Sequence, residues 1–381
     1  MSSCHKLSVL ICLFSTSLFI VGGCKQELPG VDESLNEYLD SIYAANSIEA
    51  GIMIHVECPD KNISWTAARG FSDKKTRQPL MADQPVLIAS NTKTYVAAAI
   101  LKLIEQGSFS LEQSIDTLLS PGSALLLRED GYDLSSITVR HLLSHTSGIH
   151  DYVDDHYFDA VNESPDREWT RDEQIALAIQ VGDPLGMAGE QFQYADVNYL
   201  LLTEIIEQQT DLSFFRAMRN ILDYEKHGLR HTWFVNLEEA PTEAKPLAHQ
   251  YWKKLNWDSY EINPSWDLYG GGGMVATTTD VARFFQLLFE GHIIQDDELL
   301  AQMHTYVLPQ ETSVYCLGIR HINFNGASGY YHGGFWGTDV MYLPKLNCTV
   351  AIFSLQREER ELNATINKDI LQIIENAEIA D

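Results

Sequence analysis

Ser90 and Lys93 lie three residues apart at the start of an apolar segment, a spacing that can activate a serine hydroxyl. Lys102 is the only charged residue in 94–104, and Gly107 follows where a helix would end. A helix that is apolar on nearly all sides is buried, and its N-terminus stabilises developing negative charge at Ser90. Lys93 would share a helix face with Ser90, and burial would lower its pKa so that it takes part in proton transfer. The alternative is an N-capping serine beside a lysine that extends to water.

Tyr194 and Asp196 form a second polar pair, directly before a predicted helix over 198–208. A tyrosine beside an ammonium group has a lowered pKa and can act as a general base toward Ser90. Asp196 is a suitable N-cap for the helix. The alternative is a packing tyrosine followed by an ordinary capping aspartate.

A third polar element, His332-Gly333-Gly334-Phe335, lies between two strand-like runs. Glycines within a strand indicate close approach by a ligand or by another backbone. An edge strand here could donate a backbone N–H to an oxyanion hole and pair with an extended substrate. The alternative is a plain glycine bend that carries a surface histidine.

The helices and strands that must position these residues fall into three blocks along the chain: a block with strands near each terminus and a mainly helical block between them. Strand-like alternation predicts strands near both termini, and helical periodicity dominates the middle and also flanks the strands. The predicted strands cover 50–56, 63–68, 314–322, 330–332, 339–343 and 348–355, and the predicted helices cover 31–46, 138–143, 170–179, 198–208, 212–222, 278–289 and 362–374. The pattern predicts an α/β (α+β) fold: a central antiparallel sheet from both termini, flanked by helices, with a large mainly helical region inserted at about 108–275.

The order and spacing of the three motifs resemble the β-lactamase and penicillin-binding superfamily, which opens on S-x-x-K. The closer resemblance is to the branch of class C β-lactamases and D-Ala-D-Ala carboxypeptidases, which continues with Y-x-N and with H-x-G or K-T-G. The stretches 137–149, 194–202 and 271–280 are also similar to that branch. The resemblance implies a β-lactamase/transpeptidase-like fold over nearly all of the chain after its first 30 residues.

The resemblance also implies roles for individual residues. Ser90 would be the nucleophile, Lys93 its proton partner, and Tyr194 the general base. Asp196 would contact the substrate amide. His332 and Gly334 would form the third motif and contact the substrate. The backbone N–H groups of Ser90 and Phe335 would form the oxyanion hole.

Two positions depart from the branch that the chain resembles. Asp196 replaces an asparagine and places an anion beside Lys93, which should raise the pKa of the lysine. His332-Gly333 replaces Lys-Thr and so removes a cation and a hydroxyl that hold a substrate carboxylate. We therefore expect short-chain esters to be better substrates than D-Ala-D-Ala peptides, which a His332 protonated below about pH 6.5 could hold, and cephalosporins to be the poorest. The sequence predicts a serine hydrolase with an acyl-enzyme on Ser90, either an esterase or a D-amino-acid peptidase or carboxypeptidase. A β-lactamase and a scaffold protein that has lost turnover remain the alternatives.

Composition narrows the range of partners and cofactors. The 381 residues carry a net charge of -27, which repels nucleic-acid phosphates, so the expected partner is a small molecule or a peptide. No cofactor or metal is expected, since the chain has no H-E-x-x-H motif, and the absence of a G-x-S-x-G elbow disfavours an α/β-hydrolase. A zinc site remains conceivable only in a histidine- and aspartate-rich stretch, which contains His141, His145, His150, Asp151, Asp154, Asp155 and His156.

The N-terminal 23 residues differ in kind from the rest. Lys6 precedes an apolar run over 7–21, and Val21-Gly22-Gly23-Cys24 resembles a lipoprotein cleavage site, so we expect a signal peptide over 1–23 and a lipidated Cys24. An ordinary signal peptide is the alternative. A tether over 24–31 and a single catalytic domain over 32–381 would follow, in an exported periplasmic or cell-surface lipoprotein of a bacterium whose only membrane contact is this anchor. The three later cysteines, an odd and widely spaced set, are expected to be buried free thiols: Cys58, Cys316 and Cys348.

Overall fold

The computed structural model describes residues 30–46, 48–324 and 326–378. The predicted signal peptide and Cys24 lie outside these residues. Within them, no helix is both long enough and apolar enough to cross a membrane.

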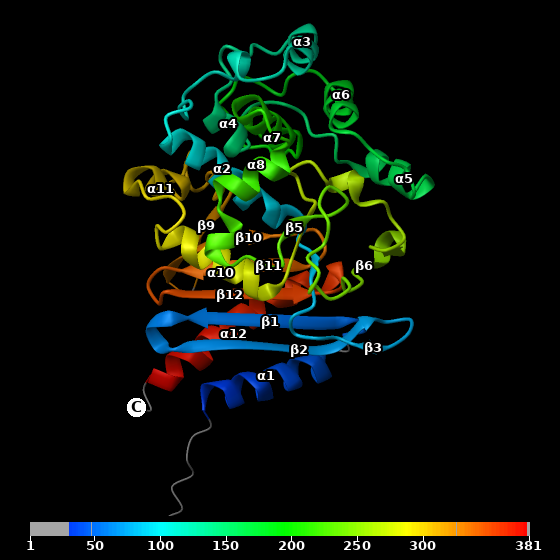
Figure 1. Ribbon diagram of the computed structural model, residues 1–381, viewed down its shortest axis with the longest axis vertical. Coiled ribbons are helices and arrows are strands. Elements are labelled where there is room, and N and C mark those ends of the chain that lie inside the picture. Colours follow the sequence, from blue (N-terminus) through cyan, green and yellow to red (C-terminus); the bar gives the residue numbers. More distant parts are fainter. Residues whose placement is uncertain (1–29, 47, 325, 379–381) are drawn as a thin grey trace, which may run out of the picture.

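A seven-stranded sheet forms the base of the molecule, and strands from both ends of the chain build it (Figure 1). Its order is β3-β2-β1-β12-β11-β10-β9, and every neighbouring pair is antiparallel. The strands are β1 (Gly51–Cys58), β2 (Ile63–Asp73), β3 (Gln78–Pro79), β9 (Arg320–Phe324), β10 (Ala327–Gly333), β11 (Thr338–Leu343) and β12 (Cys348–Ser354). The sheet predicted from both termini is therefore confirmed.

Helices cover both faces of this sheet because its strands alternate apolar side chains between the faces. Ile52 and Ile54 of β1 pack toward α1 (Val31–Ala45) and α12 (Arg360–Glu378). Met53 points to the opposite face, which α10 (Thr278–Phe289) covers. Both faces are thus closed by apolar packing.

The inserted region is mainly helical and lies on the side of α10, away from α1 and α12 (Figure 1). Its helices start where the sequence supplies caps: Thr138 and Thr170 each form a capping box. The helices on this side are α2 (Thr92–Glu105), α3 (Pro121–Glu129), α4 (Val139–Leu143), α5 (Asp155–Glu163), α6 (Arg171–Val181), α7 (Val197–Thr210), α8 (Phe214–Ile221), α9 (Tyr224–His227) and α11 (Asp297–Met303).

Short strands in this region were missed by the sequence analysis because two or three residues are too few for a periodic signal. They are β4 (Val86–Leu87), β8 (Met274–Ala276) and β5 (Trp233–Phe234), which form one sheet in that order, and the pair β6 (Tyr251–Trp252) and β7 (Trp257–Asp258). β4 leads directly to Ser90.

Two further expectations need correction. The strand predicted over 314–322 begins only at Arg320, because the preceding residues form a loop that touches β9 at a single bridge, Tyr315 to Arg320. Cys58 and Cys348 form a disulfide, whereas Cys316 is a buried free thiol as expected. The antiparallel register between β1 and β12 places Glu57 opposite Thr349, so Cys58, which follows Glu57, meets Cys348, which precedes Thr349.

Candidate active site

Ser90 lies in a short 3-10 turn, η2 (Ala89–Asn91), which runs directly into α2. Lys93 is completely buried one turn later, and its Nζ lies 3.2 Å from the Ser90 Oγ. The ammonium also donates to the carbonyl oxygen of Gly271 at 2.6 Å and pairs with Oδ1 of Asp196 at 2.7 Å. The structure thus brings Ser90, Lys93 and Asp196 together as the motif spacing implies.

The pKa of Lys93 is raised, as expected from the Asp196 charge, and the lowering effect expected from burial does not prevail. Burial favours the neutral amine, but the negative charges nearby, that of Asp196 foremost, outweigh this effect. Lys93 therefore remains an ammonium group at neutral pH. Its positive charge can stabilise negative charge that develops near Ser90.

Tyr194 lies on the loop before α7, and its ring centre is 5.0 Å from the Lys93 Nζ. Its pKa is raised because burial outweighs the opposing effects of the Lys93 charge and of hydrogen bonding to Ser90 and Lys93. The lowered pKa expected from the sequence is therefore wrong, and the phenolate is a minor species at neutral pH. The hydroxyl nevertheless lies within hydrogen-bonding reach of both Ser90 and Lys93.

Asp196 occupies the N-cap position of α7, but its side chain makes no capping hydrogen bond. The carboxylate turns instead toward Lys93. The expected placement of the Asp196 anion beside Lys93 is therefore confirmed, whereas the expected capping hydrogen bond is absent, because a buried ammonium group attracts a carboxylate strongly.

Two further carboxyl groups line the same site, and the sequence analysis did not assign them to it. Oδ1 of Asp151 accepts a hydrogen bond from the backbone N–H of Asp196 at 2.9 Å, and Asp267 ends the turn η5 (Pro264–Asp267). Burial and the Asp196 charge raise the pKa of Asp151 well above its ordinary value. The same two causes raise the pKa of Asp267 to about 8, against the opposing charge of Lys93.

The four-glycine run is the sequence signal that could have located Asp267. A Cβ on residue 272 would overlap the Asp267 carboxyl. A Cβ on residue 271 would lie 3.1 Å from Oδ2 of Asp196 and 3.2 Å from Oδ1 of Asp267. Gly271 and Gly272 therefore leave the space that two carboxyl groups occupy.

His332 is fully enclosed, and its role differs from the expected one. Its Nε2 shares a hydrogen bond with the Tyr315 hydroxyl at 3.0 Å. Burial, reinforced by the Arg320 charge, keeps its pKa well below the ordinary value, so the imidazole is neutral. Protonated His332 as a holder of carboxylates is thus excluded near neutral pH.

The strand that carries the third motif is not an edge strand along most of its length. β10 lies between β9 and β11, but its pairing with β9 ends at Tyr331 opposite Arg320. Only His332 and Gly333 extend beyond β9. The predicted edge is therefore limited to the two residues that face the site.

Gly334 and Phe335 follow at the turn toward β11. A Cβ on residue 334 would collide with Oγ1 of Thr338 and with the carbonyl oxygen of Ile88, so this glycine permits close packing against the segment before Ser90. Phe335 lines the cavity that contains Ser90. The assignment of the backbone N–H groups of Ser90 and Phe335 as the oxyanion hole remains a prediction.

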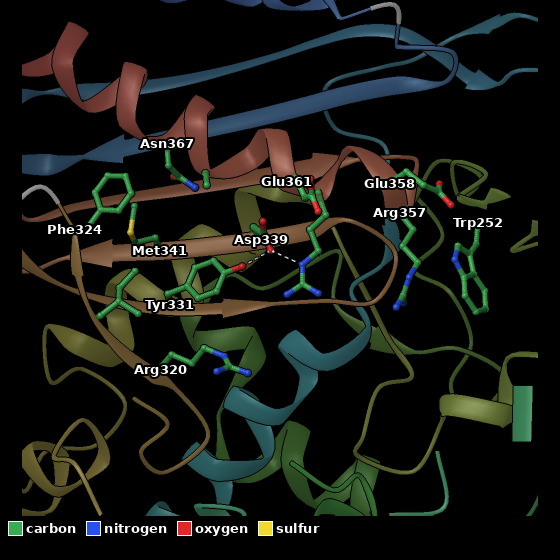
Figure 2. Close-up of a pocket in the computed structure, with 13 residues that line it drawn as sticks. Trp252, Arg320, Phe324, Tyr331, Asp339, Met341, Arg357, Glu358, Glu361 and Asn367 are labelled. Carbon is green, nitrogen blue, oxygen red and sulfur yellow. Dashed lines mark hydrogen bonds and ion pairs between the residues drawn. The ribbon is translucent and has the colours of Figure 1, made fainter. Parts of the chain in front are cut away.

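This cavity has a volume of about 400 Å³ and contains three guanidinium groups that the sequence analysis missed. Arg320 starts β9, Arg357 lies in the turn η6 (Arg357–Glu359), and Arg360 begins α12. The same arginines line a neighbouring cavity of about 570 Å³, and Figure 2 shows Arg320 and Arg357 on opposite sides of it. No local pattern identifies them, because a fold formed by distant segments brings them together.

Within the described residues, no group of three or more histidine, cysteine or acidic side chains is placed to hold a metal ion. His145 is buried, and its Nδ1 accepts a hydrogen bond from the backbone N–H of Ala195 at 3.2 Å. It therefore faces the loop that carries Tyr194, and the zinc alternative gains no support from the geometry.

Comparison with known sequences decides the family. The sequence model described as Beta-lactamase matches residues 57–373. The chain belongs to the Beta-lactamase family. Both the fold class and the assignment as a serine hydrolase, as inferred from the three motifs, are confirmed.

Several members of the superfamily are similar to the chain. Penicillin-binding protein 4* of Bacillus subtilis is 25% identical over 243 residues, which cover 59% of this chain and 49% of that protein. Protein flp of Staphylococcus aureus is 32% identical over 208 residues, which cover 54% of this chain and 36% of that protein. This Beta-lactamase family chain therefore spans half or less of the length of these curated relatives.

Solved structures share its fold at low identity. D-amino acid amidase from Ochrobactrum anthropi SV3 superposes with a TM-score of 0.75 at 21% identity, over 91% of this chain and 99% of that one. D-stereospecific amidohydrolase from Streptomyces superposes with a TM-score of 0.71 at 24% identity, over 84% of this chain and 93% of that one. EstCE1, a hydrolase with promiscuous acyltransferase activity, superposes with a TM-score of 0.69 at 18% identity, over 91% of this chain and 98% of that one.

Proposed function

We propose that this hydrolase cleaves peptides of D-amino acids whose leaving group carries a free carboxylate, through an acyl-enzyme on Ser90. The observation that carries the proposal is the set of three arginines, Arg320, Arg357 and Arg360, in the cavity that contains Ser90. Guanidinium groups bind carboxylates through paired, charge-assisted hydrogen bonds. A substrate carboxylate would therefore find its partner beside the nucleophile.

The residues present account for both halves of the reaction. Acylation joins the Ser90 Oγ to the substrate carbonyl carbon and breaks the bond from that carbon to the leaving nitrogen. The Ser90 proton passes through the Tyr194 hydroxyl to this nitrogen, while the Lys93 charge stabilises the transient phenolate. Deacylation adds water to the ester carbonyl, and one water proton returns to the Ser90 Oγ as the ester bond breaks.

The arginines change the substrate order expected from the sequence. That order assumed that loss of Lys-Thr at 332–333 leaves no fixed cation for a carboxylate. The guanidinium of Arg360 lies directly against Gly333, so a cation from α12 stands beside the vacated position. The premise is wrong, and we now place D-amino-acid peptides with a free carboxylate ahead of esters.

Ester cleavage remains the second candidate. Phe158, Trp266 and Phe335 line the same cavity and offer an apolar surface to an uncharged acyl group. Two proteins with a similar fold are named for different reactions: one is a D-amino acid amidase, and the other, EstCE1, is a hydrolase with promiscuous acyltransferase activity. An ester needs Ser90 and its proton partners but no cation.

The test combines a covalent probe with a substrate panel. A fluorescent serine-directed acylating probe should label the wild-type protein and not the Ser90→Ala variant, and both should melt at nearly the same temperature because Ser90 is not a core residue. D-Ala-D-Ala peptides, their C-terminal amides, short-chain esters and a cephalosporin are then compared by kcat/KM. Equal rates for the free acid and its C-terminal amide would contradict the proposed role of the arginines. A protein without labelling or turnover would instead be the scaffold alternative.

We also propose that the protein is exported and anchored through a lipid on Cys24. The sequence of residues 1–24 supports this, and the disulfide between Cys58 and Cys348 favours an oxidising compartment. Cys24→Ser should move the protein from the membrane fraction to the soluble fraction. Retention in the membrane would point to an uncleaved signal anchor.

A further inference from the structure

The Ser90 cavity collects opposite charges from the two parts of the molecule. Its carboxyl groups come from the helical region, at Asp151, Asp196 and Asp267, and its guanidinium groups come from β9, η6 and α12 beside the sheet. Figure 1 shows the helical region, which includes α2, on one side of β9, β10 and β11. A substrate bound at Ser90 therefore meets an acidic end and a basic end.

The acidic end holds three carboxyl groups and one ammonium group. Lys93 pairs with Asp196 and is the one ammonium group among the residues that line or contact this end in the described chain. Asp267 makes no ion pair or hydrogen bond there, and its Oδ1 is a buried oxygen without a partner. Its side chain is buried, since the residue is only 8% exposed, yet it lines the cavity.

A buried carboxyl oxygen without a partner requires an explanation, because such groups are nearly always satisfied in folded proteins. The carboxyl groups of Asp267 and Asp196 both approach Gly271, which has no side chain, and both line the Ser90 cavity. A positively charged hydrogen-bond donor in this cavity would bind a carboxyl group that lacks a partner and favour its ionised form. An alkylammonium group has both properties.

We propose that Asp267, with Asp196 and Asp151, forms a subsite for the free ammonium group of the substrate, on the acyl side of the bond that Ser90 attacks. The inference rests on the proposed function and narrows it: the preferred substrate is a zwitterion with an ammonium at one end and a carboxylate at the other. A D,D-dipeptide with both termini free has this chemistry. The high pKa of Asp267 fits an acid that awaits a cation, because an ammonium beside it would lower that pKa.

The first test compares D-Ala-D-Ala with N-acetyl-D-Ala-D-Ala, which share a carboxylate and differ only in the ammonium. We expect kcat/KM to be at least about tenfold higher for the free amine, the usual effect of one charge-assisted contact. Asp267→Asn should bring the two substrates to near parity, mainly by slowing the free amine. Asp166→Asn, at an exposed aspartate outside the cavity, serves as the matched control and should leave the ratio unchanged.

A second test measures binding without turnover. Calorimetry on the Ser90→Ala variant at about pH 7, in buffers with different ionisation enthalpies, should show proton release when D-Ala-D-Ala binds. The release should disappear with the N-acetyl dipeptide and in a variant that also carries Asp267→Asn. A residue that only supports the fold would not move this signal.

The outcomes separate this inference from the function on which it rests. Hydrolysis that depends on Ser90 but is equal for both dipeptides would overturn the ammonium subsite and leave the proposed function standing. An equal loss for both substrates in Asp267→Asn, in a protein that melts normally, would also overturn it. Absence of any Ser90-dependent hydrolysis would overturn both.

Discussion

The guanidinium of Arg360 lies against the backbone of Gly333, in the space that a side chain at residue 333 would otherwise fill. Asp339 holds it there at 3.5 Å, and Tyr331 and Asn363 donate hydrogen bonds to the same carboxylate. The glycine and the arginine are therefore two parts of one arrangement. In the branch that the chain resembles, a Lys-Thr pair on the strand serves this position, whereas here the positive charge comes from the C-terminal helix.

Arg320 provides the cleanest test of carboxylate binding. It makes no ion pair with any described residue, so Arg320→Gln leaves no buried acid without a partner, as a change at Arg360 would leave Asp339. We expect kcat/KM for D-Ala-D-Ala peptides to fall by about tenfold to a hundredfold, while the value for a short-chain ester changes by less than about threefold. Arg230→Gln, at an exposed arginine, is the control. Equal losses on both substrates would show that Arg320 supports the fold and does not bind a carboxylate.

Tyr194→Phe removes the hydroxyl and retains the ring. We expect turnover to slow by about 10²–10⁴, the usual contribution of a general acid–base group, with KM and melting temperature nearly unchanged. Steady-state kinetics with one substrate and thermal denaturation are sufficient to check this. A change in stability alone would make Tyr194 a packing residue.

Asp267 should make stability depend on pH. A carboxyl group whose pKa is higher in the folded protein than in the unfolded chain stabilises the fold fully below its ordinary pKa. That contribution is lost as pH rises through the folded-state pKa, which is about 8 for Asp267 because of burial and the Asp196 charge. The melting temperature of Asp267→Asn relative to wild type should therefore rise between pH 5 and pH 8.5. A constant difference over this range would mean that Asp267 does not titrate as described.

The disulfide between Cys58 and Cys348 closes a sequence separation of 290 residues. A cross-link of this kind restricts the unfolded chain, so the double change to serine should lower the free energy of unfolding by about 2–4 kcal/mol. Denaturant titration with and without reductant measures the effect. Cys316→Ser, at the buried free thiol, is the control for the loss of a sulfur atom without a cross-link, and reductant should not change its stability further.

Local sequence patterns predicted the helices and strands well. They did not predict which charged residues from distant segments meet in the Ser90 cavity. The helix predicted over 278–289 coincides with α10, because its apolar period and its capping Thr277 are contained in its own sequence. Ser90 and Lys93 were found for the same reason, since three residues on one helix settle their distance. Arg360 and Asp267 reach the same cavity from segments far apart along the chain, and no local pattern predicts the position of Arg360, whereas only the glycine run after Asp267 hints at its site.

The pKa directions show the same limit. From the sequence, burial was expected to lower the pKa of Lys93 and Asp196 was expected to raise it, and the lysine was expected to lower the pKa of Tyr194. Both pKa values are raised, because the nearby negative charges, Asp196 foremost, outweigh the burial of Lys93 and because the burial of Tyr194 outweighs the ammonium charge. The sign of such a shift depends on the sum of several opposing effects, and that sum needs coordinates.

The pairing of β1 with β12 sets an order of events during biosynthesis. β1 and β2 emerge early, but the other side of β1 has no partner until residue 354 has been made, since Ile52 pairs with Ser354. For most of the time of synthesis the first hairpin therefore presents an open edge with apolar faces, the kind of surface that aggregates or recruits chaperones. The sheet can close only after the last strand has left the ribosome, so completion of the nascent chain and formation of the active-site cavity are tied to one late step.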